Sequence, residues 1–348
     1  MYQEISSFHN LLYAYYQSRK CKRYMGGILQ FGYYLESNLW KLHKELRTEQ
    51  YLPSPYTYFM VHDPKERNVA APAFRDRVVQ HSLIDYIEPM FDKQFIFDSY
   101  ACRKDKGTHL GLARIQKFLK AARSIYGSQR SLYCLRMDIS KYFASISWDI
   151  LLPIVSKKIS CPQTQRLIEK IVTFHRFLNA GSVITELVNP QARKGLPIGN
   201  LTSQLFANVY LNELDQYVKR VLQVRWYARY MDDFLIVHPD KTYLHTLKDE
   251  IRCFLGENLH LNLSENKVVL SDVKNGVPFV GYRIFYDHVL VRGNTLTHIQ
   301  RKLKKRKKAY THGSLSATKL RSSKASVYGH FHHANDFYLR ERMKIWKP

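Results

Sequence analysis

Tyr230-Met231-Asp232-Asp233 places two adjacent carboxylates between the segments 225–228 and 234–237. The flanking segments are rich in the aromatic and β-branched residues that fill strands, so the acidic pair is predicted at the turn of a hairpin. Adjacent aspartates raise each other's pKa unless a divalent cation or a basic neighbour neutralises them. Their hard oxygen ligands suit Mg²⁺, which leaves its other positions to water and substrate phosphate. Taken alone, an Asp-Asp pair in a turn is more often simply solvated.

A third carboxylate, Asp138, stands in a similar setting, after a strand-like run that begins at Leu132 and before a polar turn. Three converging carboxylates can hold two Mg²⁺ ions about 3.5 to 4 Å apart, which stabilise the attacking and the leaving oxygen of a phosphoryl transfer. The alternative is an Asp that caps the following helix, with Ser140 as its competitor. Capping is the commoner role for a single Asp in this position.

Charge points to a polyanionic partner. Lysine and arginine number 54 against 29 acidic residues, a surplus of 25. A surplus of this size is typical of nucleic-acid binding, and no apolar run reaches the roughly 18 residues that span a bilayer. The polar amino terminus lacks the apolar core of a signal peptide.

The five scattered cysteines, with no Cys-x-x-Cys, indicate neither a disulfide framework nor a zinc site. We therefore expect a soluble intracellular protein with two or three subdomains and no membrane partner.

The hydrophobic pattern predicts helices over the first fifty residues, ending near Pro53, and strands at 56–61 and 68–71 that pair around a charged tip. The last 48 residues hold fourteen lysines and arginines against two acids. The run 301–308 within them is predicted to be a basic helix. A disordered tail or a localisation signal is the competing interpretation of that run.

The order of motifs along nearly the whole chain resembles the seven-block pattern of reverse transcriptases. The blocks are 65–72 with 76–80, 99–103 with 106–109, 138–143, 195–204, 230–233, 261–267 and 279–282. No single block is specific, but seven in the right order are.

This resemblance implies an α+β right-hand polymerase, with an antiparallel palm sheet backed by helices. The expected domains are N-terminal helices and fingers at 1–131, a palm at 132–287 with part of 160–200 contributing to the fingers, and a short basic helical thumb at 288–348. No RNase H, integrase or endonuclease module is expected. The implied activity is RNA-directed DNA polymerisation by two-metal nucleotidyl transfer.

By resemblance, the catalytic residues are Asp138, Asp232, Asp233 and Lys267, and the lysine lies near the departing pyrophosphate. Two Mg²⁺ ions, with Mn²⁺ as a substitute, are expected on the three aspartates and Ile139. On its own, a lysine such as Lys267 is an ordinary solubilising residue at a strand edge.

The resemblance also assigns a nucleotide site. Lys65 and Arg67 are expected to grip the incoming triphosphate, because a fixed cation stabilises the charge that the leaving pyrophosphate gains in the transition state. Phe143 is expected to exclude a 2′-hydroxyl and so to select deoxynucleotides. The remaining members of the expected nucleotide site are Ile198, Gly199 and Gln204. Without the resemblance, a charged hairpin tip favours solubility and Phe143 is a core aromatic.

The expected template and primer contacts are Arg103, Lys106, Phe279, Gly281, Tyr282, Arg301, Lys304, Lys305 and Lys308. The last four lie in the basic run, where they would meet backbone phosphates and read shape rather than sequence.

Block four carries the finer resemblance. Ile198-Gly199 followed by Ser203-Gln204 resembles the reverse transcriptases of phage and bacterial diversity-generating retroelements. Such enzymes copy a template-repeat RNA into cDNA with errors opposite adenine, and the cDNA replaces a variable repeat in a target gene. An isoleucine at 198 offers shape but no hydrogen bond near the templating base, which lowers discrimination.

Relatives of this type act in the bacterial cytoplasm, with dNTPs, a structured RNA and a small basic accessory protein that forms a pentameric helical barrel. Two alternatives stay open. One is an antiviral or retron-like reverse transcriptase, and the other is a catalytically silent RNA-binding protein.

Overall fold

The computed structural model describes residues 1–62, 66–173, 193–335 and 337–343. The chain divides into two compact units. Unit 1 holds residues 1–97, 139–223 and 249–264, and unit 2 holds residues 98–138, 224–248 and 265–348. This division interleaves segments of the chain, whereas the expected fingers, palm and thumb are nearly consecutive. The three-domain assignment therefore stays a prediction.

The start of unit 1 is helical, as the sequence pattern predicts. Its helices are α1 (Tyr2–Ile5), α2 (Phe8–Ser18), α3 (Gly26–Tyr33), α4 (Leu35–Arg47) and α5 (Phe74–Asp92). Ser7 caps α2 by accepting a hydrogen bond from the Asn10 backbone N–H. Leu39, Leu42 and Leu46 are buried at helical spacing on α4. Helix α2 packs against α5, so the amino-terminal helices form one layer with it.

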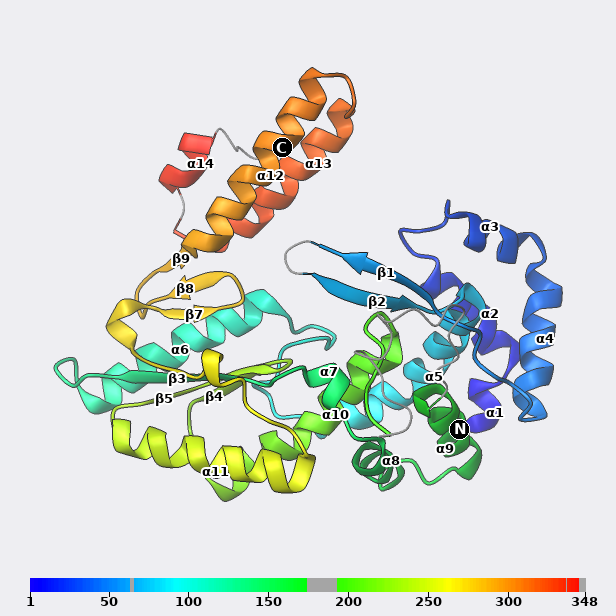
Figure 1. Ribbon diagram of the computed structural model, residues 1–348, viewed down its shortest axis with the longest axis horizontal. Coiled ribbons are helices and arrows are strands. Elements are labelled where there is room, and N and C mark those ends of the chain that lie inside the picture. Colours follow the sequence, from blue (N-terminus) through cyan, green and yellow to red (C-terminus); the bar gives the residue numbers. More distant parts are fainter. Residues whose placement is uncertain (63–65, 174–192, 336, 344–348) are drawn as a thin grey trace. The chain divides into compact units, whose positions relative to one another are not determined.

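A two-stranded hairpin leaves this helical layer (Figure 1). Strands β1 (Thr57–Val61) and β2 (Arg67–Ala71) pair antiparallel, with Thr57 opposite Ala71 and Val61 opposite Arg67. The predicted strands, 56–61 and 68–71, agree with these bounds to within one residue.

Further helices and a π-helical segment lie in the described part of unit 1. They are α7 (Tyr142–Ser145), α8 (Trp148–Ser156), α9 (Pro162–Thr173), α10 (Leu201–Gln216) and η1 (Tyr217–Val221). Helix α10 is buried along most of its length and packs against α5 and α8. It therefore forms the central helix of the unit.

Unit 2 is built on a four-stranded antiparallel sheet in the order β4-β5-β3-β6. The strands are β3 (Tyr133–Asp138), β4 (Tyr227–Tyr230), β5 (Asp233–His238) and β6 (Val269–Asp272). Helix α6 (Thr108–Tyr126) packs against β4 and β5, with Leu112, Ile115 and Leu119 buried (Figure 1). Helix α11 (Lys241–Leu259) follows β5, and its second half belongs to unit 1.

A second, three-stranded sheet joins this layer to the carboxy-terminal helices. It contains β7 (Val277–Phe279), β8 (Tyr282–Ile284) and β9 (Val289–Val291), and short 3₁₀ turns η2 (Glu265–Lys267) and η3 (Val273–Asn275) flank β6. The helices are α12 (Gly293–Thr311), α13 (Ala317–Phe331) and α14 (Phe337–Met343). Leu303 and Phe331 belong to the same buried cluster as the two sheets, so the core of the unit continues into α12 and α13 (Figure 1).

Across the described ranges, no helix combines the length and the apolar character that crossing a bilayer requires.

Candidate active site

The acidic hairpin forms where the sequence predicts it. Tyr230 ends β4 and pairs with Asp233, which begins β5, so Met231 and Asp232 make the connecting turn. Met231 has a left-handed φ of 56°, which lets the chain reverse within two residues. The predicted turn at the acidic pair is confirmed.

The third carboxylate lies beside this turn. Asp138 ends β3 and is directly opposite Asp233 in the β3–β5 register. Opposed residues in an antiparallel pair have Cα atoms about 4.5 to 5.5 Å apart. Residues about 95 positions apart in the sequence are thereby brought to one end of one sheet, with Asp232 in the adjoining turn.

Two basic side chains pair with two of these three carboxylates. The Lys267 ammonium donates to Asp138 at 2.5 Å, and the Arg136 guanidinium donates to both carboxylate oxygens of Asp233 at 2.8 and 2.6 Å. Both pairs are partly buried, because the side chains of Asp138 and Asp233 are only 12% and 18% exposed. Asp138 and Asp233 therefore each face a basic partner.

The electrostatics of the group show that its acids repel one another. Burial raises the pKa of Asp232, and the charge of Asp138 raises that pKa further. Burial also raises the pKa of Asp233, although the hydrogen bonds from Arg136 oppose that shift. A site that disfavours its own negative charge in this way favours a bound cation.

Residues 138, 232 and 233 offer the oxygen ligands that Mg²⁺ and Mn²⁺ take in proteins. Even so, within 1–62, 66–173, 193–335 and 337–343 no three His, Cys, Asp or Glu side chains are grouped closely enough to hold a metal ion. Asp138 and Asp233 face Lys267 and Arg136 in this structure. The donor chemistry fits a divalent metal once those cations are displaced. Ile139, the fourth expected ligand, follows Asp138 and forms a backbone bridge with Leu263.

Arg136 was not among the residues predicted from sequence. Its signal was nonetheless present, because it stands two residues before Asp138 in a strand and so shares a face with it. A cation on the same face as a metal-binding carboxylate is a recognisable pattern. The partner, Asp233, becomes evident only from the strand register.

The expected nucleotide-binding residues that the structure describes belong to unit 1, where three motif blocks meet through the backbone. The Leu196 N–H donates to the Phe143 carbonyl at 2.8 Å, and the Ala70 N–H donates to the Ile198 carbonyl at 2.7 Å. The loop that carries Leu196 and Ile198 thus bonds to Phe143 through Leu196 and to strand β2 through Ile198. Arg67 begins that strand and is exposed, whereas Lys65 lies outside the described residues.

Gly199 is required by a close approach. Its φ is +125°, and an added Cβ would lie 2.5 Å from the Ala70 carbonyl oxygen. Only glycine lets the loop before α10 lie against β2 in this conformation. Gln204, one turn into α10, is exposed.

A cavity of about 310 Å³ opens beside this loop within unit 1. Gly199, Gln204 and Val69 line it, and so do Arg77 and Gln80 of helix α5. Gln80 accepts a hydrogen bond from the Leu201 N–H at 3.3 Å, which fixes the start of α10. Arg77 and Gln80 were quoted within block one but were not predicted as site residues.

The expected template contacts fall into three groups in unit 2, and the basic run on the carboxy-terminal helices is the third. Phe279 and Tyr282 are fully buried, and the Tyr282 hydroxyl donates to the His330 carbonyl at 2.7 Å. These two rings are therefore part of the core of unit 2. In the 279–282 motif, Gly281 in the turn is partly exposed. Arg103 donates to the Ser99 carbonyl at 2.9 Å, and Lys106 lies over the Tyr100 ring.

The basic run is helical, as predicted. Arg301, Lys304, Lys305 and Lys308 are exposed on α12, and Leu303 on the opposite side is buried. The amphipathic pattern therefore presents a row of cations to solvent.

Comparison with known proteins identifies the family. Residues 62–284 match the model of the reverse transcriptase (RNA-dependent DNA polymerase) family. Protein YkfC of Escherichia coli is 27% identical over 277 residues, covering 70% of this chain and 70% of that protein. The group II intron-encoded protein LtrA of Lactococcus lactis is 24% identical over 317 residues, covering 72% of this chain and 50% of LtrA.

Solved structures agree on the fold. Apo telomerase from Candida tropicalis superimposes with a TM-score of 0.52 at 11% sequence identity, covering 81% of this chain and 58% of the telomerase chain. At this identity the likeness speaks for the fold alone, and it confirms the predicted α+β right-hand polymerase class. The chain spans about half the length of LtrA and under two thirds of that telomerase chain.

The family match covers well over half of the residues and includes all three aspartates. The chain therefore belongs to the reverse transcriptase family, the RNA-directed DNA polymerases.

Proposed function

We propose that this chain extends a primer with deoxynucleotides on an RNA template, through a divalent-metal site on Asp138, Asp232 and Asp233. The observation that carries the proposal is the strand register, which sets Asp138 directly opposite Asp233 with Asp232 in the next turn. Membership of the reverse transcriptase family supports the same chemistry.

Each charged residue of the group has a defined part in this proposal. Mg²⁺ ions, when bound, supply positive charge to the attacking and leaving oxygens. Asp138, Asp232 and Asp233 would hold these ions, and Arg136 and Lys267 pair with Asp233 and Asp138 in the metal-free protein. The Lys267 ammonium would donate a proton to the departing pyrophosphate, which gains charge in the transition state.

The nucleotide site of the proposal lies in unit 1. Arg67 at the start of β2 meets the triphosphate as a charge-assisted donor. Phe143 excludes a 2′-hydroxyl, and Ile198 contributes shape near the templating base. The backbone bonds from Leu196 to Phe143 and from Ala70 to Ile198 support this grouping, because they join both residues to the same loop before α10.

Primer extension on a defined RNA template tests the proposal. We expect cDNA with dNTPs and Mg²⁺, and none with EDTA or without the RNA. Lys267→Ala should slow single-nucleotide addition while leaving primer–template binding intact, and Lys120→Ala is the control because it removes an exposed lysine outside the acidic group. Absence of cDNA from folded protein that still binds RNA would favour the silent RNA-binding alternative.

We further propose that the cDNA is error-prone opposite adenine and serves to diversify a target gene. The support is the sequence of block four, Ile198-Gly199 followed by Ser203-Gln204. A template-repeat RNA and a small basic accessory protein forming a pentameric barrel would be the partners in the bacterial cytoplasm.

Sequencing of cDNA made on the native RNA, with and without the accessory protein, tests this finer proposal. Misincorporation should concentrate opposite adenine and fall in an Ile198→Gln variant. An unchanged error spectrum would reject the role of Ile198. A chain whose gene has no neighbouring template-repeat and variable-repeat pair would instead be an antiviral or retron-like enzyme.

A further inference from the structure

A small pocket lies at the end of the unit 2 sheet that is far from the aspartates. Leu132 lines it and directly precedes β3, and Asp272 lines it at the end of β6, paired with Tyr133. Asp138 stands at the other end of β3, six residues beyond Leu132. At about 3.3 Å per residue the separation is roughly 20 Å. The pocket is therefore distinct from the acidic site.

The floor of this pocket is apolar and has the size of one ring. Leu119, Leu132 and Val273 contribute buried aliphatic groups, and the volume is about 160 Å³. An apolar cavity of about 150 Å³ accommodates benzene. A drug-sized ligand needs roughly twice this space or more. The floor therefore fits a single six-membered ring.

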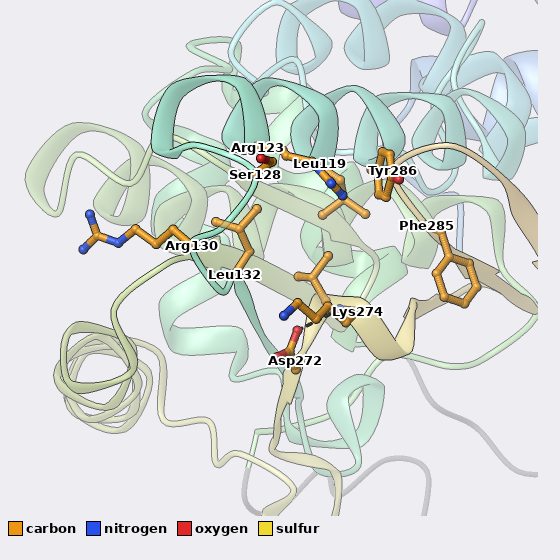
Figure 2. A pocket seen from close by; sticks show the side chains of 10 residues that line it. Leu119, Arg123, Ser128, Arg130, Leu132, Asp272, Lys274, Phe285 and Tyr286 are labelled. Carbon is orange, nitrogen blue, oxygen red and sulfur yellow. Dashed lines mark hydrogen bonds between the residues drawn. The ribbon is translucent and has the colours of Figure 1, made fainter.

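The walls are aromatic and cationic. The Arg123 guanidinium lies over the Tyr286 ring, 4.0 Å from its centroid, and Phe285 lines the same side (Figure 2). Arg130 and Lys274 are exposed at the rim, where Figure 2 shows Arg130 extending outward. Three cations thus surround an entrance that contains one carboxylate.

That carboxylate, Asp272, argues against an acidic peptide as the occupant. It accepts the Lys274 backbone N–H at 2.8 Å and keeps its remaining acceptor capacity at the edge of the pocket. It would repel an acidic side chain but would accept an N–H from the edge of a nucleobase. Phosphates that flank the base would meet Arg123, Arg130 and Lys274.

We propose that this pocket binds one unstacked base of single-stranded RNA, outside the polymerisation site. Such bases stack on aromatic rings and on Arg guanidinium planes, and Arg123 on Tyr286 presents both. The surplus of 25 cations in the chain attracts RNA generally, whereas the pocket adds a contact that only a splayed base can make.

Fluorescence anisotropy with a labelled single-stranded RNA, without dNTPs or divalent metal, tests the proposal independently of catalysis. Arg123→Ala and Tyr286→Ala should each weaken binding about fivefold or more, as expected for one stacked base. Lys120→Ala removes one positive charge from the exposed face of the same helix and should change binding less than twofold. Arg123→Lys keeps the charge, loses the planar stack and should resemble Arg123→Ala.

Two readouts separate this pocket from general charge effects. Binding of fully duplex RNA should be equal for Arg123→Ala and Lys120→Ala, and a 4-thiouridine RNA should crosslink at Phe285 or Tyr286. Primer extension by Arg123→Ala and by Tyr286→Ala should match that of the parent protein. A failure of the pocket proposal can therefore be told apart from a failure of the proposed polymerase activity. The proposal is overturned if the pocket variants bind single-stranded RNA like Lys120→Ala, or if a peptide with an aromatic anchor, and not RNA, loses affinity in them.

Discussion

Replacing Arg136 with methionine tests the view that, without metal, basic side chains stabilise the carboxylates of the acidic site. The substitution keeps much of the side-chain volume and removes both hydrogen bonds to Asp233. Asp233, whose side chain is 18% exposed, would then carry an uncompensated charge. Its pKa, already raised by burial, would rise further without Arg136.

The expected magnitude follows from the geometry. Hydrogen bonds to charged groups contribute about 1.5 to 3 kcal/mol, and removing one partner of a fully buried pair costs about 3 to 5 kcal/mol. Because the pair is only partly buried, we expect a loss of about 2 to 3 kcal/mol in the free energy of unfolding without divalent metal. Saturating Mg²⁺ should recover much of this loss, since the ion replaces the missing positive charge and binds only the folded chain.

Urea unfolding at pH 7.5, with EDTA or with saturating Mg²⁺, measures both quantities. The matched control is Arg166→Met, which breaks a two-bond pair with Glu49 in which the side chains are 52% and 32% exposed. Because solvent screens that exposed pair, its loss should cost far less stability than the loss of the Arg136–Asp233 pair and show no metal dependence. Our reasoning is refuted if Arg136→Met loses no stability, or loses the same amount with and without Mg²⁺.

Three further predictions concern other parts of the chain. Gly199→Ala should lower the free energy of unfolding in urea by more than about 2 kcal/mol, because alanine disfavours the φ of +125° and its Cβ would clash with the Ala70 carbonyl oxygen. The control is Gly256→Ala, where a Cβ meets nothing within 4 Å, and it should be neutral or slightly stabilising. Equal effects of the two substitutions would refute the close approach at Gly199. Phe143→Val should raise ribonucleotide incorporation relative to deoxynucleotide incorporation in primer extension at least tenfold, and an unchanged ratio would remove its gating role. Burial, and then the charges of nearby histidines, lower the pKa of His330, so the folded state favours its neutral ring. The stability that the neutral ring contributes is therefore complete above about pH 6.5 and is lost as the pH falls below that value. His330→Gln should therefore flatten the loss of stability between pH 7.5 and 5.5, and an unchanged slope would contradict this.

The local elements of the fold could be predicted because their signals are short in range. The strand residues on both sides of Asp232 and Asp233 fix a turn whatever the rest of the chain does. The β1–β2 hairpin and the amphipathic α12 follow from alternation and helical spacing in the same way. The family resemblance supplied the order in which these elements assemble.

Side-chain pairing was not predictable, because it depends on register and on which face of a strand is covered. Arg136 meets Asp233 only because β3 and β5 align Asp138 with Asp233. Alternation likewise could not tell that Phe279 and Tyr282 face the core and not the template. The pocket at Arg123 was invisible for the same reason, since its residues come from four separate segments of the chain.

Single-turnover addition of one dNTP by an Asp232→Asn variant tests the central claim most directly. Asp240→Asn is the control, because Asp240 is exposed and caps α11 through hydrogen bonds that asparagine can keep. The acidic-site account predicts a loss of about a thousandfold or more for Asp232→Asn, with primer–template binding and thermal stability retained, since a metal site supplies several kcal/mol to the transition state. A rate within tenfold of the Asp240→Asn control would contradict it.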